Sequence, residues 1–155
     1  MAADLLYKVA YDEAVRALAE QQAAIESFRG RAGLLLSSAA VTTSLLGAHA
    51  LQGGGSSPIS GLALAGFAGV AIASLAILWP RRWEGAADPH DVIESYIESA
   101  EPAPIEKLHR DLSVHMRSSY LENREGLEEL VVFFQIASLL LVIEIVLWLV
   151  AIALA

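Results

Sequence analysis

Long apolar segments dominate the pattern of hydrophobic and polar positions along the chain. In the 47 residues Gly33–Trp79 there is no Asp, Glu, Lys or Arg. The glycine run Gln52–Pro58 ends in proline and is typical of a tight connection. It divides the stretch into two apolar segments, at residues 33–51 and 60–79. Residues 33–80 are therefore predicted to form a transmembrane hairpin.

A third apolar segment covers residues 130–155 and is interrupted only by Gln135 and Glu144. Each of the three segments has about the 20 residues that a helix needs to cross the hydrocarbon core of a bilayer. The pattern predicts an all-α integral membrane protein with three transmembrane helices.

The regions 1–32 and 81–129 are charged and helical by pattern. In 1–32, the positions of a helix-packing seam recur at alternating spacings of three and four. These positions are Tyr11, Ala14, Leu18, Gln21, Ile25 and Phe28. We expect this helix to run straight into the first membrane span. In 81–129, Asp88 and Pro89 predict the N-cap and first turn of a short helix. From Ile105 one long helix is expected to reach the C-terminus.

Basic residues predict the orientation, because cytoplasmic loops of membrane proteins carry an excess of Lys and Arg. Arg29 and Arg31 precede the first span, Arg81 and Arg82 follow the second, and the connection between these spans has none. With three spans, all ten Lys and Arg lie on one side. We expect both charged regions to be cytoplasmic extensions of a protein integral to the cytoplasmic (inner) membrane, with the N-terminus inside and the C-terminus outside.

Composition agrees with this picture. The chain is 55% hydrophobic with a mean hydropathy of +0.52, well above the share of a soluble domain. Its net charge of -8 argues against nucleic acid as a partner, because neutralising phosphates requires a basic surface. Without cysteine there is neither a disulfide framework nor a thiolate zinc site.

The second apolar segment carries a small residue at every fourth position of one helix face. Helices in lipid associate through close packing of small residues and through hydrogen bonds. The series therefore predicts a packing face and, with it, a homo-oligomer. The alternative is that small residues are simply common in alanine-rich membrane helices. The series consists of Gly61, Ala65, Gly69 and Ala73.

The first apolar segment is unusually rich in hydroxyl side chains. They could line a wetted pore, or they could bond to their own helix backbone and allow tight helix packing. Both interpretations remain open from the sequence. The hydroxyl residues are Ser37, Ser38, Thr42, Thr43 and Ser44.

Glu144 lies near the middle of the third apolar segment, on the same helix face as Ala137 and Ala151. A charged carboxylate at that depth costs several kcal/mol, so such a group is neutralised, paired or placed in a polar cavity. It could be an ion or proton site or a pore constriction, or a protonated glutamate that holds helices together. Candidate partners are the hydroxyls of the first segment, Gln135, His49 and the same glutamate in a neighbouring copy.

Other chemistry is not expected. His109 and His115 are six residues apart and so point to different faces, and His49 and His90 lie in other segments, which argues against a metal site. The chain lacks a Gly-x-Ser-x-Gly elbow, a Gly-rich phosphate loop and a His-Glu-x-x-His motif. We expect no cofactor and no enzymatic activity. The acidic residues of 81–129 form a solvated helical face or, alternatively, bind a basic partner protein.

The junction 25–38 has the sequence IESFRGRAGLLLSS and joins a cytoplasmic amphipathic helix to a two-helix hairpin. The hairpin is followed by a cytoplasmic helical span and then by a C-terminal membrane helix. This layout resembles the small membrane effectors of bacterial anti-phage signalling, the Pycsar transmembrane and SLATT groups. The resemblance covers nearly the whole chain in layout and 14 residues in sequence. It implies an oligomer of the inner membrane that compromises the membrane after a nucleotide signal. The chain departs from these groups in lacking a separate cyclic-nucleotide-binding domain.

The sequence thus predicts an oligomeric membrane protein that forms or regulates an ion or solute pathway. Its expected partners are the lipid bilayer and further copies of itself, and a cytoplasmic protein or a nucleotide signal is a further candidate. The alternative is a non-conducting scaffold whose cytoplasmic helices bind a partner protein. The polar residues expected at the pathway are Glu144, Gln135, Ser37, Ser44 and Thr42.

Overall fold

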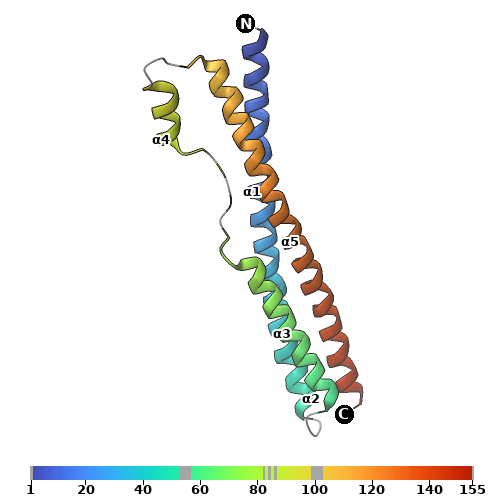
Figure 1. Ribbon diagram of the computed structural model, residues 1–155. Coiled ribbons are helices and arrows are strands. Elements are labelled where there is room, and N and C mark those ends of the chain that lie inside the picture. The colour runs from blue at the N-terminus through green and yellow to red at the C-terminus, as the bar shows by residue number, and fades with distance from the viewer. Residues whose placement is uncertain are drawn as a thin grey trace. The chain divides into compact units, whose positions relative to one another are not determined.

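All elements that the structure describes are helices (Figure 1). The computed structural model describes residues 2–52, 57–81, 83, 85, 87–98 and 103–154. Three helical stretches are long and apolar enough to cross a membrane: Leu5–Ala50, Pro58–Leu78 and Ile105–Ala153. The predicted all-α fold with three membrane-length apolar helices is confirmed. The glycines of the predicted connection lie outside the described residues.

The first membrane-length stretch is one continuous helical run. Helix α1 (Ala2–Thr42) passes without a break from the charged N-terminal region into the first apolar segment. One π-helical turn, η1 (Thr43–Gly47), and the short helix α2 (Ala48–Gln52) continue it. The first proline of the chain is Pro58, so no residue in this run removes a helical hydrogen bond. The expected direct entry into the first span is confirmed.

Helix α3 (Pro58–Leu78) has a start that its sequence specifies closely. Pro58 occupies the first turn, where a missing N–H is not needed. The Ser57 side chain caps the helix by accepting a hydrogen bond from the backbone N–H of Ser60 at 3.2 Å. Pro80 follows the end of this helix. Proline and cap together set the length of the second apolar helix.

Helix α4 (Pro89–Val92) also begins with proline, and the Asp88 carboxylate accepts a hydrogen bond from the His90 backbone N–H at 2.8 Å. It continues as a π-helical turn, η2 (Ile93–Ile97). Helix α5 (Ile105–Ala153) follows and runs for 49 residues. The short helix after Asp88 and the single long helix from Ile105 are both confirmed.

Packing divides the chain into two compact units. The charged unit comprises Met1–Ala24 and Arg81–Leu127, and the apolar unit comprises Ile25–Pro80 and Glu128–Ala155. Both α1 and α5 contribute a part to each unit. The apolar unit begins at Ile25, whereas the uncharged stretch begins at Gly33. Phe28, between these two points, already packs in the apolar unit through an edge contact with the ring of Phe134, at a centroid distance of 5.6 Å.

In the charged unit, α1 and α5 pack against each other as parallel helices. The Tyr11 ring stacks on the His109 ring at a centroid distance of 5.4 Å. The side-chain amide of Gln21 donates to the backbone carbonyl of Tyr120 at 3.0 Å. These contacts join residues 98 and 99 positions apart, so the two helices run in the same direction. The seam predicted along α1 is its contact with α5.

The segment between α3 and α5 contacts another side of α5 within the charged unit. The Trp83 ring lies against Gly126, where an added Cβ would approach a ring atom to 3.1 Å. The Tyr96 hydroxyl donates to the Asp111 carboxylate at 3.0 Å. This hydrogen bond, with smaller effects of burial and of the carboxylate charge, raises the pKa of Tyr96.

In the apolar unit, α3 packs antiparallel against α5. Gly66 faces Glu144 and Gly69 faces Leu140, so the numbers rise along one helix as they fall along the other. Small residues allow this close approach of the two backbones. The buried positions of α3 recur every three to four residues, apart from the adjacent pair Ala73 and Ser74: Ser60, Ala63, Gly66, Val70, Ala73, Ser74 and Ile77.

Candidate functional site

Glu144 of α5 lies inside the apolar unit with none of its surface exposed. The Thr43 hydroxyl, on η1, donates a hydrogen bond to its Oε1 atom at 2.5 Å. Ala137 and Ala151, which were expected on the same helix face, are buried as well. The carboxyl group thus points between the helices and not outward.

The π-helical turn η1 is contacted by α5 at both of its ends. Thr43 opens the turn and bonds Glu144, while Gly47 closes it against Trp148. A Cβ on Gly47 would lie 3.1 Å from two ring atoms of Trp148, so a residue without a side chain suits this position. Glu144 and Trp148 are one helical turn apart and therefore share a face of α5. Single π-turns within α-helices occur frequently at functional sites.

Helix α3 completes the site through Gly66. A Cβ on Gly66 would lie 3.3 Å from the Glu144 Cβ and 3.6 Å from its Cα. Trp148 packs nearby in a core with Ala50, Ala63 and Ala151. The Glu144 side chain is therefore enclosed by three helical segments, and the close approach of α3 depends on the absence of a side chain at Gly66.

Two polar atoms of the site have incomplete hydrogen bonding. Glu144 Oε2 and Trp148 Nε1 are both buried, and neither makes a well-aligned hydrogen bond with any described atom. The indole N–H approaches the carboxylate without that alignment. A buried polar atom without a good partner is costly, so this arrangement calls for a functional explanation.

Glu144 has no cation to neutralise it within the described apolar unit. The basic residues of this unit are Arg29, Arg31 and His49. His49 is exposed and lies six residues beyond Thr43, and the two arginines precede Thr43 by twelve residues or more. Among the described residues, the Glu144 carboxyl is hydrogen-bonded by the Thr43 hydroxyl and forms no ion pair.

Three of the four remaining hydroxyl residues of the first apolar segment lie on the outside of the unit. The Ser37, Ser38 and Ser44 side chains are exposed, and each donates to the backbone carbonyl four residues earlier, at 2.9, 2.8 and 2.7 Å. Thr42 is half-buried. A shallow hollow of about 300 Å³ lies beside Ser44, lined by Ala40, Val41 and Leu45. Gln135 is exposed on α5 and does not join Glu144.

The series of small residues on α3 is divided between two surroundings. Gly69 and Ala73 face the interior, where a Cβ on Gly69 would lie 2.8 Å from a methyl group of Leu140. Gly61 and Ala65 are exposed, and an added Cβ on Gly61 would contact nothing within 4 Å. Part of the predicted packing face therefore serves the protomer itself, and its other part is open.

Sequence reasoning placed Glu144 inward but did not single out Trp148, Gly66 and Gly47 as its surroundings. Trp148 could have been found, since a residue four positions along a helix lies on the same face. Gly66 and Gly47 could not, because the rotation of one helix against another is decided by packing and not by the periodicity of either helix alone. Among the hydroxyls left open as partners, Thr43 is the one that the structure brings to Glu144.

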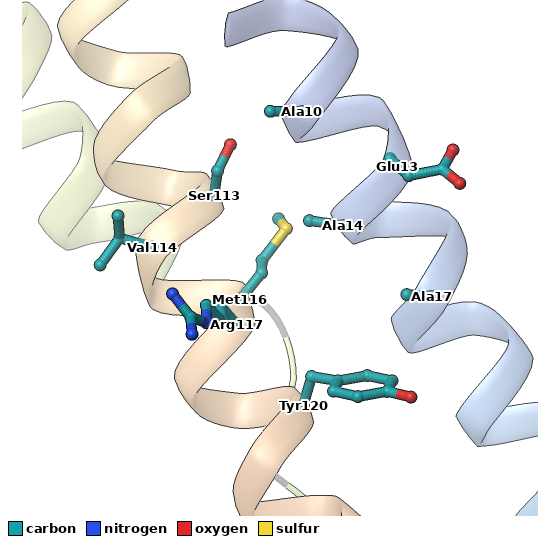
Figure 2. Close-up of a pocket in the computed structure, with 9 residues that line it drawn as sticks. All are labelled: Ala10, Glu13, Ala14, Ala17, Ser113, Val114, Met116, Arg117 and Tyr120. Atoms are coloured by element: carbon teal, nitrogen blue, oxygen red, sulfur yellow. The ribbon is translucent and has the colours of Figure 1, made fainter.

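The charged unit contains an apolar groove of about 480 Å³ between α1 and α5 (Figure 2). Ala10, Ala14 and Ala17 line it from α1, and the Met116 side chain points toward Ala14 from α5. Tyr120 lies at one end. Among the described residues, no group of three or more His, Cys, Asp or Glu is placed to hold a metal ion.

Comparisons with protein families, with curated proteins and with solved structures find no match to this chain.

Proposed function

We propose that the protein is a homo-oligomeric membrane protein that forms or regulates a pathway for ions or small solutes. The observation that carries this proposal is the difference between the outer faces of the three apolar helices. The exposed face of the first helical run bears the hydroxyls of Ser37 and Ser38 on α1 and of Ser44 on η1. Leu34, Val41 and Leu45 are exposed beside them. The exposed side chains of α3, and those of α5 from Val132 onward except Gln135, are apolar. Apolar faces suit lipid, whereas a hydroxyl-bearing face suits water or another protein surface.

The hydrogen bonds of these serines fit a wetted face. Each hydroxyl proton is donated to the backbone of its own helix, which satisfies the donor. Each oxygen keeps lone pairs that can accept from water or approach a cation. Such a face can contact a hydrated ion without leaving unpaired donors.

A single copy presents a single hydroxyl face, so an enclosed pathway requires several copies around an axis. The exposed Gly61 and Ala65 support close contacts between copies, because small residues allow membrane helices to approach. We expect Gly61→Leu to lower the mass of the detergent-solubilised assembly. Gly69→Leu is a less specific test, because Gly69 also contacts Leu140 within the protomer. An unchanged mass in Gly61→Leu would exclude this face as the interface.

The orientation and the biological setting belong to the same proposal. All ten Lys and Arg lie on one side of the proposed spans, which supports a cytoplasmic charged unit, a cytoplasmic N-terminus and an outer C-terminus. The resemblance to the Pycsar transmembrane and SLATT groups supports the inner membrane of a bacterium, and an effector that opens the pathway after a nucleotide signal.

Thiol accessibility tests the hydroxyl face directly, since the chain has no cysteine of its own. Ser44 follows Thr43, and Val146 is two residues beyond Glu144, so these two positions lie at nearly the same level. In proteoliposomes, Ser44→Cys should react with a charged methanethiosulfonate and change ion flux. The exposed Val146→Cys should not react, because lipid excludes the reagent. Equal reaction at both positions, or no flux from the wild type, would contradict the proposal.

The groove of the charged unit favours a second candidate function, a scaffold that binds a partner protein. Its alanines and Met116 offer an apolar surface outside the three apolar segments 33–51, 60–79 and 130–155, which a helix of a partner could cover. Liposome flux separates the two functions, because a scaffold conducts nothing.

A further inference from the structure

We infer that Glu144 and Thr43 form a reversible proton-binding site, and that the state of this site controls the pathway proposed above. The control rests on the proposed function, whereas proton binding does not. The inference stands on three observations: a fully buried carboxyl, a hydroxyl bonded to one of its oxygens, and a second oxygen without a well-formed hydrogen bond.

The groups around the carboxyl suit a proton better than a metal cation. A sodium or calcium ion needs several oxygen ligands around it. Near Glu144 the side-chain oxygen is that of Thr43, and the other polar group is the N–H of Trp148, which repels a cation. A proton binds one carboxylate oxygen, and the O–H that it forms needs a single hydrogen-bond acceptor, which the Thr43 hydroxyl oxygen provides.

The hydrogen bonds can accommodate both states of the carboxyl. In the ionised state, Thr43 donates to Oε1 and the Trp148 N–H faces the carboxylate. When a proton binds a carboxylate oxygen, the new O–H donates to Thr43 Oγ1. The Thr43 hydroxyl then turns and donates to a carbonyl one turn earlier in its own helix, as the neighbouring Ser44 already does toward Ala40. One proton is gained and no hydrogen-bond donor is left unpaired at Thr43.

No other titratable group faces Glu144 from the described helices that enclose it. Helix α3 has no titratable residue along its length. On the first helical run the nearest one is His49, which is exposed, and on α5 the nearest is Glu129, fifteen residues earlier. A pH response of this core therefore belongs to Glu144.

The connection to the pathway is short. Thr43 points inward to Glu144, and the next residue, Ser44, lies on the exposed hydroxyl face. Both belong to the π-turn η1, which Trp148 contacts at its other end, at Gly47. A change in the hydrogen bond of Thr43 therefore acts on the same π-turn that carries Ser44, and such turns occur frequently at functional sites. Binding of a proton at Glu144 can thereby move the outer face of the same helix.

Spectroscopy on the full-length protein in detergent tests the proton site. An infrared titration should contain a carboxylic-acid C=O band that is present in the wild type and lost in Glu144→Gln. In a Trp79→Phe/Trp83→Phe background, Trp148 emission should follow the same titration and become independent of pH in Glu144→Gln. Thr43→Val should shift the midpoint, and the control Thr42→Val, one residue away, should not. A titration that Glu144→Gln leaves unchanged overturns the site.

Flux measurements in liposomes test the control separately. Glu144→Gln should assemble with the wild-type mass and conduct without the pH dependence of the wild type. If the wild type conducts and Glu144→Gln keeps the same pH dependence, the control is overturned. If the wild type conducts nothing while the spectroscopic titration is lost in Glu144→Gln, the proposed pathway fails and the proton site is supported.

Discussion

The charged and apolar units use the same two helices, α1 and α5, yet the polar contacts between these helices have different roles in each unit. In the charged unit, Gln21 bonds the Tyr120 carbonyl beside an outer surface where Arg16 pairs with Glu13 and Glu20 at exposed positions. In the apolar unit, Thr43 bonds a carboxyl that has no exposed surface. Loss of the first bond leaves an uncharged carbonyl at Tyr120, a residue that is partly exposed, whereas loss of the second leaves a carboxyl in an apolar core.

The two units also differ in what covers the α1–α5 pair. In the apolar unit α3 packs against α5 through glycine and alanine. In the charged unit one side of the pair remains an open groove that alanines and Met116 line. The comparison indicates that the apolar unit depends on shape, because close packing is the main source of association in lipid. The charged unit can tolerate less complete packing, because burial from water contributes there.

The largest effect should come from removing Trp148, whose side chain is 0% exposed. Trp148→Ala leaves a cavity against Gly47 and Ala63, and we expect a loss of about 3–5 kcal/mol in the free energy of unfolding, as for other buried tryptophans. Unfolding in mixed detergent micelles measures this loss. Trp79→Ala is the control, because Trp79 is 68% exposed. Equal losses in both variants would show that the apolar unit does not depend on this core.

Gly66→Leu should have the next largest effect. Its Cβ alone would lie 3.3 Å from the Glu144 Cβ, so α3 must move away from α5, at a cost of about 1–3 kcal/mol typical of overpacking. Ala68→Leu, at an exposed position two residues later, adds a side chain of the same kind without a clash. The comparison of their unfolding midpoints isolates the clash. If Gly66→Leu unfolds like Ala68→Leu, α3 does not pack closely on Glu144.

A pair of substitutions tests the central difference between the units. Thr43→Val removes the donor to Glu144 and should cost about 1–2 kcal/mol, near the upper end for hydrogen bonds between membrane helices. Gln21→Leu removes both the donor to Tyr120 and the unpaired buried Oε1 atom, so its cost should stay below about 1 kcal/mol. The same micelle titration applies to both. A larger loss for Gln21→Leu would reverse the comparison.

The smallest effect concerns the contact of Tyr96 in the charged unit, and it is measured by titration at alkaline pH. Because the pKa of Tyr96 is raised in the folded protein, its contact with Asp111 stabilises the fold at pH values below the ordinary tyrosine pKa of about 10 and is lost as the pH rises through the raised value. When tyrosinate formation is followed by absorbance, the component that ionises at the highest pH should be lost in Tyr96→Phe. Asp111→Asn should bring that component to lower pH, and an unchanged titration would contradict the assigned cause.

Much of the site could be anticipated from single helices. The central position of Glu144 in an apolar segment, its shared face with Ala137 and Ala151, and the nearby hydroxyls follow from spacing alone. The choice of Thr43 over its neighbours could not be anticipated. A π-turn adds one residue to the repeat, so the faces of the helical run beyond Thr42, in η1 and α2, differ from those of a regular α-helix.

The sequence by itself determined the helical fold, the three membrane-length segments and the helix ends at prolines, because these depend on hydropathy and on local backbone chemistry. Tertiary structure decided which residues of each helix face inward. It divided the small residues of α3 between Gly69 against Leu140 and the exposed Gly61, and it paired Glu144 with Thr43. The faces of α3 are nearly equally apolar, so hydropathy does not distinguish them. The inward face is the one on which small residues, namely glycine, alanine and serine, allow the backbones to approach.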